Sequence, residues 1–309
     1  MSELVLVTGA TGFVGRAVVA TLLRSGRRVF CPVRSDGEAA QRLRTSGAQV
    51  SVVGDFRAEA LVAACSGAPD AVVHLAASGV RPDERDPRAL VAGHALLTIE
   101  VLRAALQWRP RLVLDTGSWS EYGASQTALR ETSPISPTSA YGVAKASATS
   151  WARNLADSGG LRLLTLCLFN VYGPHERPPR LVPTLLEAAR TKEVPSLTSG
   201  RAIRDFVFVE DVAEAYLRAL SLPDTVPLPA ALHVATGRGT PARDVVQTVA
   251  VELDAPWLLA GLGRLSDRPD EPPSVVGSTE LTDEVLGWHP ATDLATGLTR
   301  TMDYEARRG

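Results

Sequence analysis

The sequence predicts an α/β protein in which helices cover both faces of a doubly wound parallel sheet. Three observations predict this fold class. Short apolar runs alternate with helix-like stretches along residues 1–170, which is the order that a parallel sheet requires. The runs are apolar throughout, as expected of strands that are buried on both faces. A loop with three glycines joins the first run to the first helix, and such a turn is typical of this fold class.

The elements of the first part are expected in the following order. Strands are predicted where β-branched and apolar residues form short runs, at Leu4–Val7, Val29–Val33, Gln49–Val53, Ala71–Leu75, Leu112–Leu114 and Leu163–Phe169. Helices are predicted where apolar residues recur with a helical period, at Phe13–Arg24, Leu90–Trp108 and Tyr141–Asp157.

After Asn170 the composition changes. Residues 175–183, 221–229 and 268–274 are rich in proline and are predicted to be loops. Between them we expect helices at Asp211–Leu220 and Pro241–Leu253 and a short strand at His233–Ala235. We therefore expect residues 1–170, with about 205–235, to form one domain, and residues 171–204 and 236–309 to form a smaller substrate-binding region.

Composition excludes several classes of protein. The net charge of −2 and the hydrophobic content of 45% indicate a globular protein with no nucleic-acid or anionic-membrane partner. No apolar run approaches the roughly 20 residues that cross a bilayer, and the first strand begins at Leu4, so we expect no membrane span, no signal peptide and a cytoplasmic location. Three cysteines without a CxxC pair and five histidines without HxxxH spacing predict reduced thiols and no metal site.

The glycine loop predicts a dinucleotide site. Residues 8–15 read TGATGFVG, with Gly9, Gly12 and Gly15 between a strand and a helix. Glycine permits the tight turn and the close approach of backbone to a pyrophosphate, and the helix N-terminus supplies unpaired N–H donors. We expect Thr11, Phe13 and Val14 to contact the cofactor as well, and we name this domain a Rossmann-type domain.

The end of the second strand selects the cofactor. An acidic side chain there binds the ribose hydroxyls of NAD, and a basic one accepts the 2′-phosphate of NADP. The chain offers Val33, Arg34 and Ser35, so NADP(H) is favoured, while Asp36 keeps NAD(H) possible. The further cofactor contacts that we predict are Asp55, Phe56, Leu75, Ala76, Ala77, Phe169 and Val171.

A catalytic group is predicted around Tyr141 and Lys145, which lie four residues apart and hence on one face of a helix. A neighbouring ammonium lowers the pKa of a phenol, so that it can exchange a proton with a substrate oxygen. Both residues are also expected to contact the cofactor. Ser118, after the strand at Leu112–Leu114, is expected to bind the same substrate oxygen; Thr116 and Ser120 are alternatives.

The motifs together resemble those of the extended short-chain dehydrogenase/reductases, also called the NAD-dependent epimerase/dehydratase family. The resemblance covers nearly the whole chain. It rests on TGATGFVG (8–15), VVHLAA (72–77), GSWSEYG (117–123), YGVAK (141–145), LFNVYGP (168–174), RDFVFVEDVAEA (204–215) and LGWHP (286–290). The resemblance implies a Rossmann fold with a small C-terminal domain, a nucleotide-diphosphate sugar as substrate, and a homodimer built on the helices at Leu90–Trp108 and Tyr141–Asp157.

The resemblance also implies roles for single residues. Ser118, Tyr141 and Lys145 match the catalytic trio of the family. Asn170 matches a residue that contacts the sugar diphosphate. Arg204 and Arg268 match arginines that grip the nucleotide, and Ser78 is expected to contact the substrate.

Two positions depart from the family pattern. The long helix after the fourth strand usually carries an asparagine where this chain has His94, which either takes over that role or simply packs. Relatives that remove water from the sugar carry an Asp-Glu pair at the position of Trp119 and Ser120. Because dehydration needs these acids, we reject it. Trp119 is expected to form an apolar wall beside the sugar or to lie in the core.

These observations lead to one preferred function and three alternatives. We expect NADPH-dependent reduction of a nucleotide-activated 4-keto-6-deoxyhexose. A C4 epimerase with bound NAD would need only the same trio. Reduction of a ketone that is not a sugar is the next alternative, and a non-catalytic dinucleotide-binding regulator is the last, since such proteins commonly lose the tyrosine or the lysine.

Overall fold

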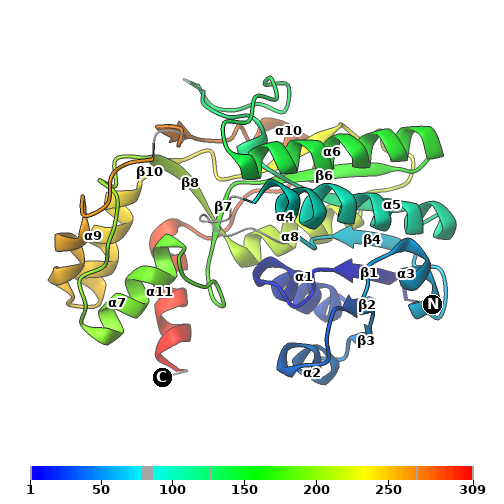
Figure 1. The fold of residues 1–309 in the computed structure, drawn as a ribbon, viewed down its shortest axis with the longest axis horizontal. Coiled ribbons are helices and arrows are strands. Elements are labelled where there is room, and N and C mark those ends of the chain that lie inside the picture. The colour runs from blue at the N-terminus through cyan, green and yellow to red at the C-terminus, as the bar shows by residue number, and fades with distance from the viewer. Residues whose placement is uncertain (1, 78–85, 126, 269–270, 308–309) are drawn as a thin grey trace.

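The computed structural model describes residues 2–77, 86–125, 127–268 and 271–307 (Figure 1). Its main sheet has seven strands in the order β3-β2-β1-β4-β5-β6-β9. Every neighbouring pair is parallel, so the predicted Rossmann-type sheet is confirmed. The strands are β1 (Leu4–Thr8), β2 (Arg28–Val33), β3 (Gln49–Val52), β4 (Ala71–His74), β5 (Leu112–Ser118), β6 (Leu163–Leu168) and β9 (Ala231–Val234).

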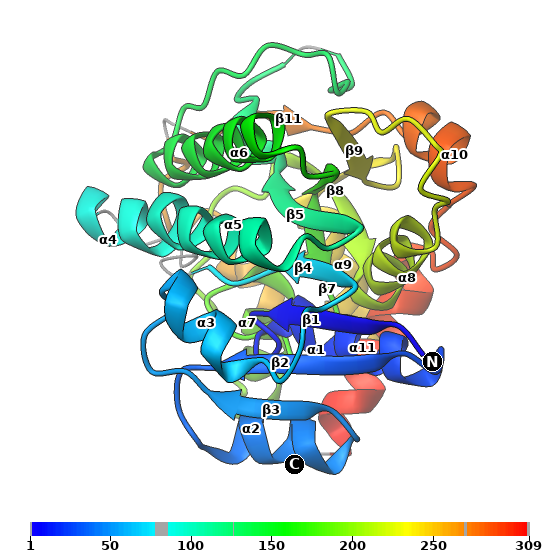
Figure 2. The same cartoon turned by 90° about the vertical axis from the view of Figure 1, so that its right-hand side faces the viewer.

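Two layers of helices cover this sheet, one on each face (Figure 2). One layer contains α1 (Phe13–Arg24), α2 (Glu38–Thr45), α8 (Val209–Leu220) and α10 (Glu280–Leu286). The other contains α3 (Ala58–Ala64), α4 (Pro87–Val91), α5 (Leu97–Trp108) and α6 (Ala140–Gly159). The strands are buried between the layers, which explains why the sequence shows no apolar–polar alternation in them.

The helix expected at Leu90–Trp108 is longer and less regular than predicted. It comprises α4, a π-helical turn at Ala92–Leu96, and α5. By length and composition the run Pro87–Trp108 could cross a membrane, which corrects our expectation that no stretch is long enough. However, Val101, Leu102 and Ala105 are fully buried in the cluster that α5 shares with α3 and α6. The run is therefore a core helix of the fold.

A second, smaller sheet, three α-helices and a 3₁₀ helix at Pro256–Gly261 form the second part of the described chain, at the left of Figure 1. Strand β8 (Ile203–Phe208) lies between β10 and β11 and also pairs with β7. The remaining elements are β7 (Asn170–Tyr172), β10 (Gly239–Pro241), β11 (Ser274–Val275), α7 (Leu181–Thr191), α9 (Ala242–Glu252) and α11 (Leu294–Ala306). Their apolar side chains form a separate core.

The division between the two parts differs in detail from the expected one. Residues 203–208 belong to the second sheet, and the chain re-enters the first part only at α8. The region after residue 236 is also shared, because Leu286 and Trp288 join the core of the main sheet. The chain thus crosses between the two parts several times, and the carboxyl edge of the main sheet faces the loops that make these crossings (Figure 1).

Candidate active site

The glycine loop has a backbone that only glycine accommodates. Gly9 has a φ of 71°, and a Cβ there would lie 2.6 Å from the backbone nitrogen of Ala76. A Cβ on Gly15 would lie 2.1 Å from the carbonyl oxygen of Gly9. Gly12 is exposed on the open side of the loop. The loop follows β1, whose neighbours β2 and β4 mark the switch point of the sheet, so its shape and place fit a dinucleotide pyrophosphate.

A row of buried, hydrogen-bonded polar side chains holds this loop in place. Thr8 Oγ1 lies 2.8 Å from His74 Nδ1, and His74 Nε2 lies 3.0 Å from Thr98 Oγ1. Thr8 Oγ1 also accepts a bond from the backbone N–H of Ala76 at 3.2 Å. Burial, with a smaller effect of Lys145, lowers the pKa of His74 to about 3. The imidazole is therefore neutral, and it holds the loop to β4 and α5.

At the end of β2, Val33 is buried while Arg34 and Ser35 are exposed. The guanidinium carbon of Arg34 lies 6.0 Å from the ring centroid of Phe56, so these two predicted cofactor residues are brought together. Asp36 is bound to Arg44 at 2.6 Å, and Asp55 to Arg57 at 2.9 Å. Both acids are exposed and have arginine partners, and surface pairs of this kind are weak enough to exchange partners.

The other predicted cofactor residues lie on neighbouring strand ends. Leu75, Ala76 and Ala77 follow β4 and are half-buried, as is Val171 in β7, whereas Ser78 lies outside the described residues. Phe169 is buried, and its ring centroid lies 5.1 Å from that of His233. Thr11, Phe13 and Val14 are half-buried or exposed along the loop and the first turn of α1. Their roles stay predictions.

Tyr141 and Lys145 occupy the first two turns of α6, against the carboxyl end of β5. The Ser139 side chain caps α6 by accepting the N–H of Gly142 at 3.0 Å. A Cβ on Gly142 would lie 2.3 Å from the Ser120 carbonyl oxygen, so a glycine lets this turn approach the segment after β5. Lys145 Nζ donates to the carbonyl oxygen of Thr116. The structure therefore brings Ser118, Tyr141 and Lys145 to one end of the sheet.

The structure separates Ser118 from its two alternatives. The Thr116 hydroxyl donates to the His74 carbonyl oxygen at 2.7 Å and lies 2.7 Å from the Tyr216 hydroxyl, so it is committed to the interior of the sheet. Ser120 donates to Ser118 Oγ through its hydroxyl at 2.9 Å and its N–H at 3.3 Å. Because Ser118 Oγ accepts both bonds, its own proton can donate to a substrate oxygen.

Two buried acids near Lys145 are not among the residues expected at the site from the sequence. Asp115 is 2% exposed and Glu121 is 4% exposed. Burial raises the pKa of both carboxyl groups, and the charge of Lys145 opposes this rise. Glu121 Oε1 accepts the N–H of Ser118 at 2.7 Å and completes a capping box. The spacing of Ser118 and Glu121, which is that of a capping box, is the signal that could have identified Glu121.

His94 lies beside Tyr141. It is 2% exposed, and its ring meets the Tyr141 ring edge-on with centroids 5.3 Å apart. His94 sits in the π-helical turn at Ala92–Leu96, and such turns are often found at functional sites. Packing against the tyrosine is thus established, and a part in proton transfer stays a prediction.

On the side of the second sheet, Trp119 and Arg204 lie together. The Arg204 guanidinium carbon is 5.7 Å from the Trp119 ring centroid, and Nη2 binds Glu271 Oε1 at 2.6 Å. Arg204 is only 5% exposed, so its charge is held at this place. Asn170 Oδ1 is buried without a hydrogen-bond partner among the described residues. Arg268 is exposed, and its carbonyl oxygen accepts the N–H of Glu271 at 3.2 Å, so its part in binding the nucleotide stays a prediction.

Comparisons with known proteins agree with this geometry. A model of the NAD dependent epimerase/dehydratase family matches residues 5–235. The chain is 28% identical to a dTDP-glucose 4,6-dehydratase of Neisseria meningitidis serogroup B, over 97% of this chain and 92% of the relative. It is 29% identical to a UDP-glucose 4-epimerase of Mycolicibacterium smegmatis, over 97% of each.

Solved structures give the same result. MoeE5 in complex with UDP-glucose and NAD superimposes with a TM-score of 0.86 at 28% identity, over 98% of this chain and 99% of that one. The Thermus thermophilus UDP-glucose 4-epimerase in complex with NAD gives a TM-score of 0.85 at 26% identity, over 98% of both chains.

Proposed function

We propose that this chain, which belongs to the NAD-dependent epimerase/dehydratase family, transfers hydride at C4 of a nucleotide-activated 6-deoxyhexose and so reduces a 4-keto sugar. The observation that carries the proposal is that the first two turns of α6, with Tyr141 and Lys145, pack against the segment at the carboxyl end of β5 that carries Ser118. Trp119 follows Ser118 directly in the chain and pairs with Arg204 of the second sheet. These groups handle one proton and orient one oxygen, and they supply no second acid.

Each side chain of the trio has a separate task in this proposal. Tyr141 gives its proton to the sugar oxygen, or takes it in the reverse direction. The ammonium of Lys145 is held by the Thr116 carbonyl oxygen and would stabilise the negative charge that develops on the Tyr141 oxygen as its proton leaves. Ser118 donates a hydrogen bond to the same sugar oxygen and keeps its proton, because its own oxygen already accepts from Ser120. A bound nicotinamide supplies the hydride.

Dehydration is not part of the proposal. Trp119 and Ser120 carry no acid, and the acid nearest in sequence, Glu121, is buried and bound to the Ser118 N–H. Trp119 instead packs against the Arg204 guanidinium. This pair supports a site in which Arg204 and Asn170 hold the diphosphate and Trp119 covers an apolar carbon of the sugar.

The cofactor preference separates two candidate reactions. Arg34 is exposed at the end of β2, which supports NADP(H) and net reduction. The solved relatives hold NAD, which weighs against that preference. A C4 epimerase that oxidises and re-reduces the sugar with bound NAD is therefore the second candidate, and the UDP-glucose 4-epimerases among the relatives favour it.

Two parallel assays distinguish the two. The purified enzyme is mixed with NADPH or NADH and a panel of nucleotide 4-keto-6-deoxysugars, and nicotinamide absorbance is followed. In parallel it is incubated with NAD and the corresponding nucleotide sugars that carry a C4 hydroxyl, and the C4 epimers are separated by chromatography. The reductase proposal requires stoichiometric loss of NADPH with each sugar that is reduced. Interconversion of two C4 epimers of a nucleotide sugar, without net use of either coenzyme, would establish the epimerase instead.

A variant of Arg34 tests the cofactor argument directly. If Arg34 binds the 2′-phosphate, Arg34→Ala raises the KM for NADPH by roughly tenfold and leaves that for NADH unchanged. Arg24→Ala removes an exposed arginine from the end of α1 and serves as the control. Equal effects of Arg34→Ala on both coenzymes would remove the basis for NADP(H).

We propose further that the protein is a cytoplasmic homodimer. Helices α5 and α6 lie side by side at one face of the molecule (Figures 1 and 2). Leu96, just before α5, and Val143 and Trp151, in α6, are 53%, 55% and 46% exposed, and large apolar side chains exposed on neighbouring helices are typical of protein–protein interfaces. Val143→Asp should convert the dimer to a monomer in light scattering; a monomeric wild-type protein would refute the dimer.

A further inference from the structure

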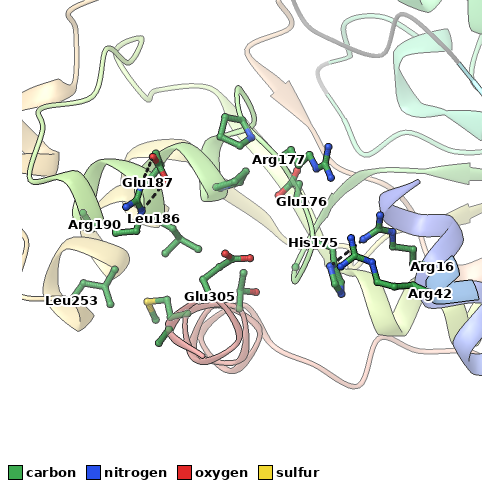
Figure 3. A pocket seen from close by; sticks show the side chains of 17 residues that line it. Arg16, Arg42, His175, Glu176, Arg177, Leu186, Glu187, Arg190, Leu253 and Glu305 are labelled. Atoms are coloured by element: carbon green, nitrogen blue, oxygen red, sulfur yellow. Dashed lines mark hydrogen bonds and ion pairs between the residues drawn. The ribbon is translucent and has the colours of Figure 1, made fainter. Parts of the chain in front are cut away.

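A cavity of about 800 Å³ lies apart from the predicted catalytic trio, between the two parts of the chain. Helices α1 and α2 line it on one side, and α7, α11 and the segment after β7 line it on the other (Figure 3). Ser118, Tyr141, Lys145 and the three glycines of the cofactor loop do not line it. Cavities of this volume take small organic ligands.

One end of the cavity is cationic. Arg16 and Arg42 lie next to His175 at this end (Figure 3), and Arg16 Nη1 is 3.5 Å from His175 Nδ1. Arg177 adds a third guanidinium to the lining. Arg42 has Glu38 as an ion partner at 2.9 Å, but both side chains are exposed, so the pair is weak and can exchange partners. Three guanidinium groups therefore line this end, and the carboxylate of Glu305 also lines the cavity.

The other end is apolar. Leu186, Leu253 and Met302 line it, and Leu186 and Leu253 lie on the side away from Arg16 and Arg42 in Figure 3. Glu187 and Arg190 also line this end, and they bind each other at 2.5 Å and so cancel each other's charge. Glu305, which also lines the cavity, lies between Leu253 and His175 in Figure 3. The two ends of the cavity thus differ in chemistry.

Glu176 lies between the two ends (Figure 3). The residue keeps some exposure, but its Oε2 atom is buried and has no hydrogen-bond partner among the described residues. Burial raises the pKa of this carboxyl group to about 8, with Arg180 opposing the rise. At neutral pH it is therefore uncharged, adds nothing to offset the arginines, and offers a hydrogen bond to an occupant.

We propose that this cavity binds a small organic phosphate, with its phosphate at Arg16, Arg42 and Arg177 and its apolar body against Leu186, Leu253 and Met302. Guanidinium groups match phosphate oxygens in pairs, and three of them suit a doubly charged group. Glu176 would bond to a polar atom in the middle of the ligand. The site is separate from the proposed reaction and does not depend on its nature.

Phenyl phosphate is a suitable probe, because it carries both a phosphate and an apolar ring. Its binding is measured by titration calorimetry on the full chain saturated with NAD or NADP, so that the cofactor site is filled. We expect Arg42→Glu to weaken phenyl phosphate binding by at least roughly tenfold. Arg24→Glu, on an exposed arginine of α1 outside the cavity, should leave it unchanged.

A second variant tests the apolar end. Leu253→Ser, at a side chain that is 38% exposed, should weaken phenyl phosphate but not inorganic phosphate. Failure of phenyl phosphate to bind at about 10 mM, roughly ten times the dissociation constant of about 1 mM of a weak ligand, would overturn the proposal. So would binding that Arg42→Glu leaves intact, or inorganic phosphate binding as tightly as phenyl phosphate.

Discussion

At the scale of single residues, burial decides the charge state of Glu176. Its pKa of about 8 lies above the ordinary value of 4.5. Between these two values the folded protein holds a proton that the unfolded chain has lost. The proton held on Glu176 therefore makes its full contribution to the free energy of unfolding below about pH 4.5. As the pH rises from there through about 8, this contribution is lost, by on the order of 1 kcal/mol per pH unit.

The variant Glu176→Gln keeps the uncharged form at every pH. Its free energy of unfolding, relative to the wild type, should thus rise between pH 5 and pH 8, and the two proteins should become equal near pH 4. Urea denaturation at a series of pH values measures this difference. Stability curves that stay parallel across the range would show that Glu176 titrates normally.

Tyr141 is the residue on which the proposed chemistry depends. Tyr141→Phe keeps the ring that meets His94 at 5.3 Å but removes the proton, so turnover should fall by about 100-fold or more. Cofactor affinity, measured by calorimetry, should change little. Turnover close to that of the wild type would remove Tyr141 from the mechanism, and loss of cofactor binding would indicate a structural role instead.

At the scale of elements, the sequence predicts a helix or strand best where local patterns alone determine it. Helix α1 begins at Phe13 and ends at Arg24 as expected, because an apolar strand, three glycines and a helical period all agree there. Strands β7, β8, β10 and β11 were not predicted. They are short, between two and six residues, and exist through pairing with one another rather than through a period of their own.

The candidate site shows the same division. Tyr141 and Lys145 are linked by helical spacing, so the sequence places them on one face. The neighbours His94, Asp115 and Arg204 come from distant segments, and only the sheet order brings them near. The turn at His94 is π-helical, which no periodicity within Leu90–Trp108 indicates. His94 and Arg204 are therefore expected near the site only through the family resemblance. Their contacts with Tyr141 and Trp119 depend on tertiary packing, which local spacing does not indicate.

The glycine loop offers a test of how much one turn contributes. Gly9→Ala destabilises the loop in two ways. It places a side chain at a residue with a positive φ, and its Cβ would lie 2.6 Å from the Ala76 backbone nitrogen. Gly26 also has a positive φ, of 81°, but a Cβ there meets nothing within 4 Å. Gly26→Ala should therefore cost only about 1–2 kcal/mol of stability.

Gly9→Ala should cost more than this control and should also raise the dissociation constant of the dinucleotide by at least roughly tenfold, since the backbone of β4 cannot move aside. Thermal unfolding and calorimetric titration of both variants measure the two effects. If the variants lose the same stability and both bind the cofactor normally, the close approach of Gly9 to Ala76 is not required.

At the scale of the whole molecule, two motifs far apart in the sequence hold the parts together. Asp211, in the first turn of α8, accepts the N–H of Thr292 at 2.9 Å, and its carbonyl oxygen accepts the Trp288 indole N–H at 3.0 Å. Trp288 is 1% exposed and joins the core of the main sheet. The segments 204–215 and 286–290 therefore pack against each other, in a contact that we call the joint. Through it the C-terminal region adds Trp288 to the core of the main sheet.

This joint predicts that the molecule unfolds as one unit. Trp288→Ala should lower the free energy of unfolding by about 3–5 kcal/mol, the usual cost of removing a large buried ring, even though the residue lies outside the first 235 residues. Leu265→Ala, at a side chain that is 50% exposed, is the control and should change stability by less than about 0.5 kcal/mol. Urea unfolding of both variants is followed by circular dichroism and, in parallel, by the loss of bound cofactor. In Trp288→Ala we expect the midpoints of both signals to shift together to a lower urea concentration. Cofactor binding that persists after the C-terminal helices have unfolded would show that the two parts fold independently.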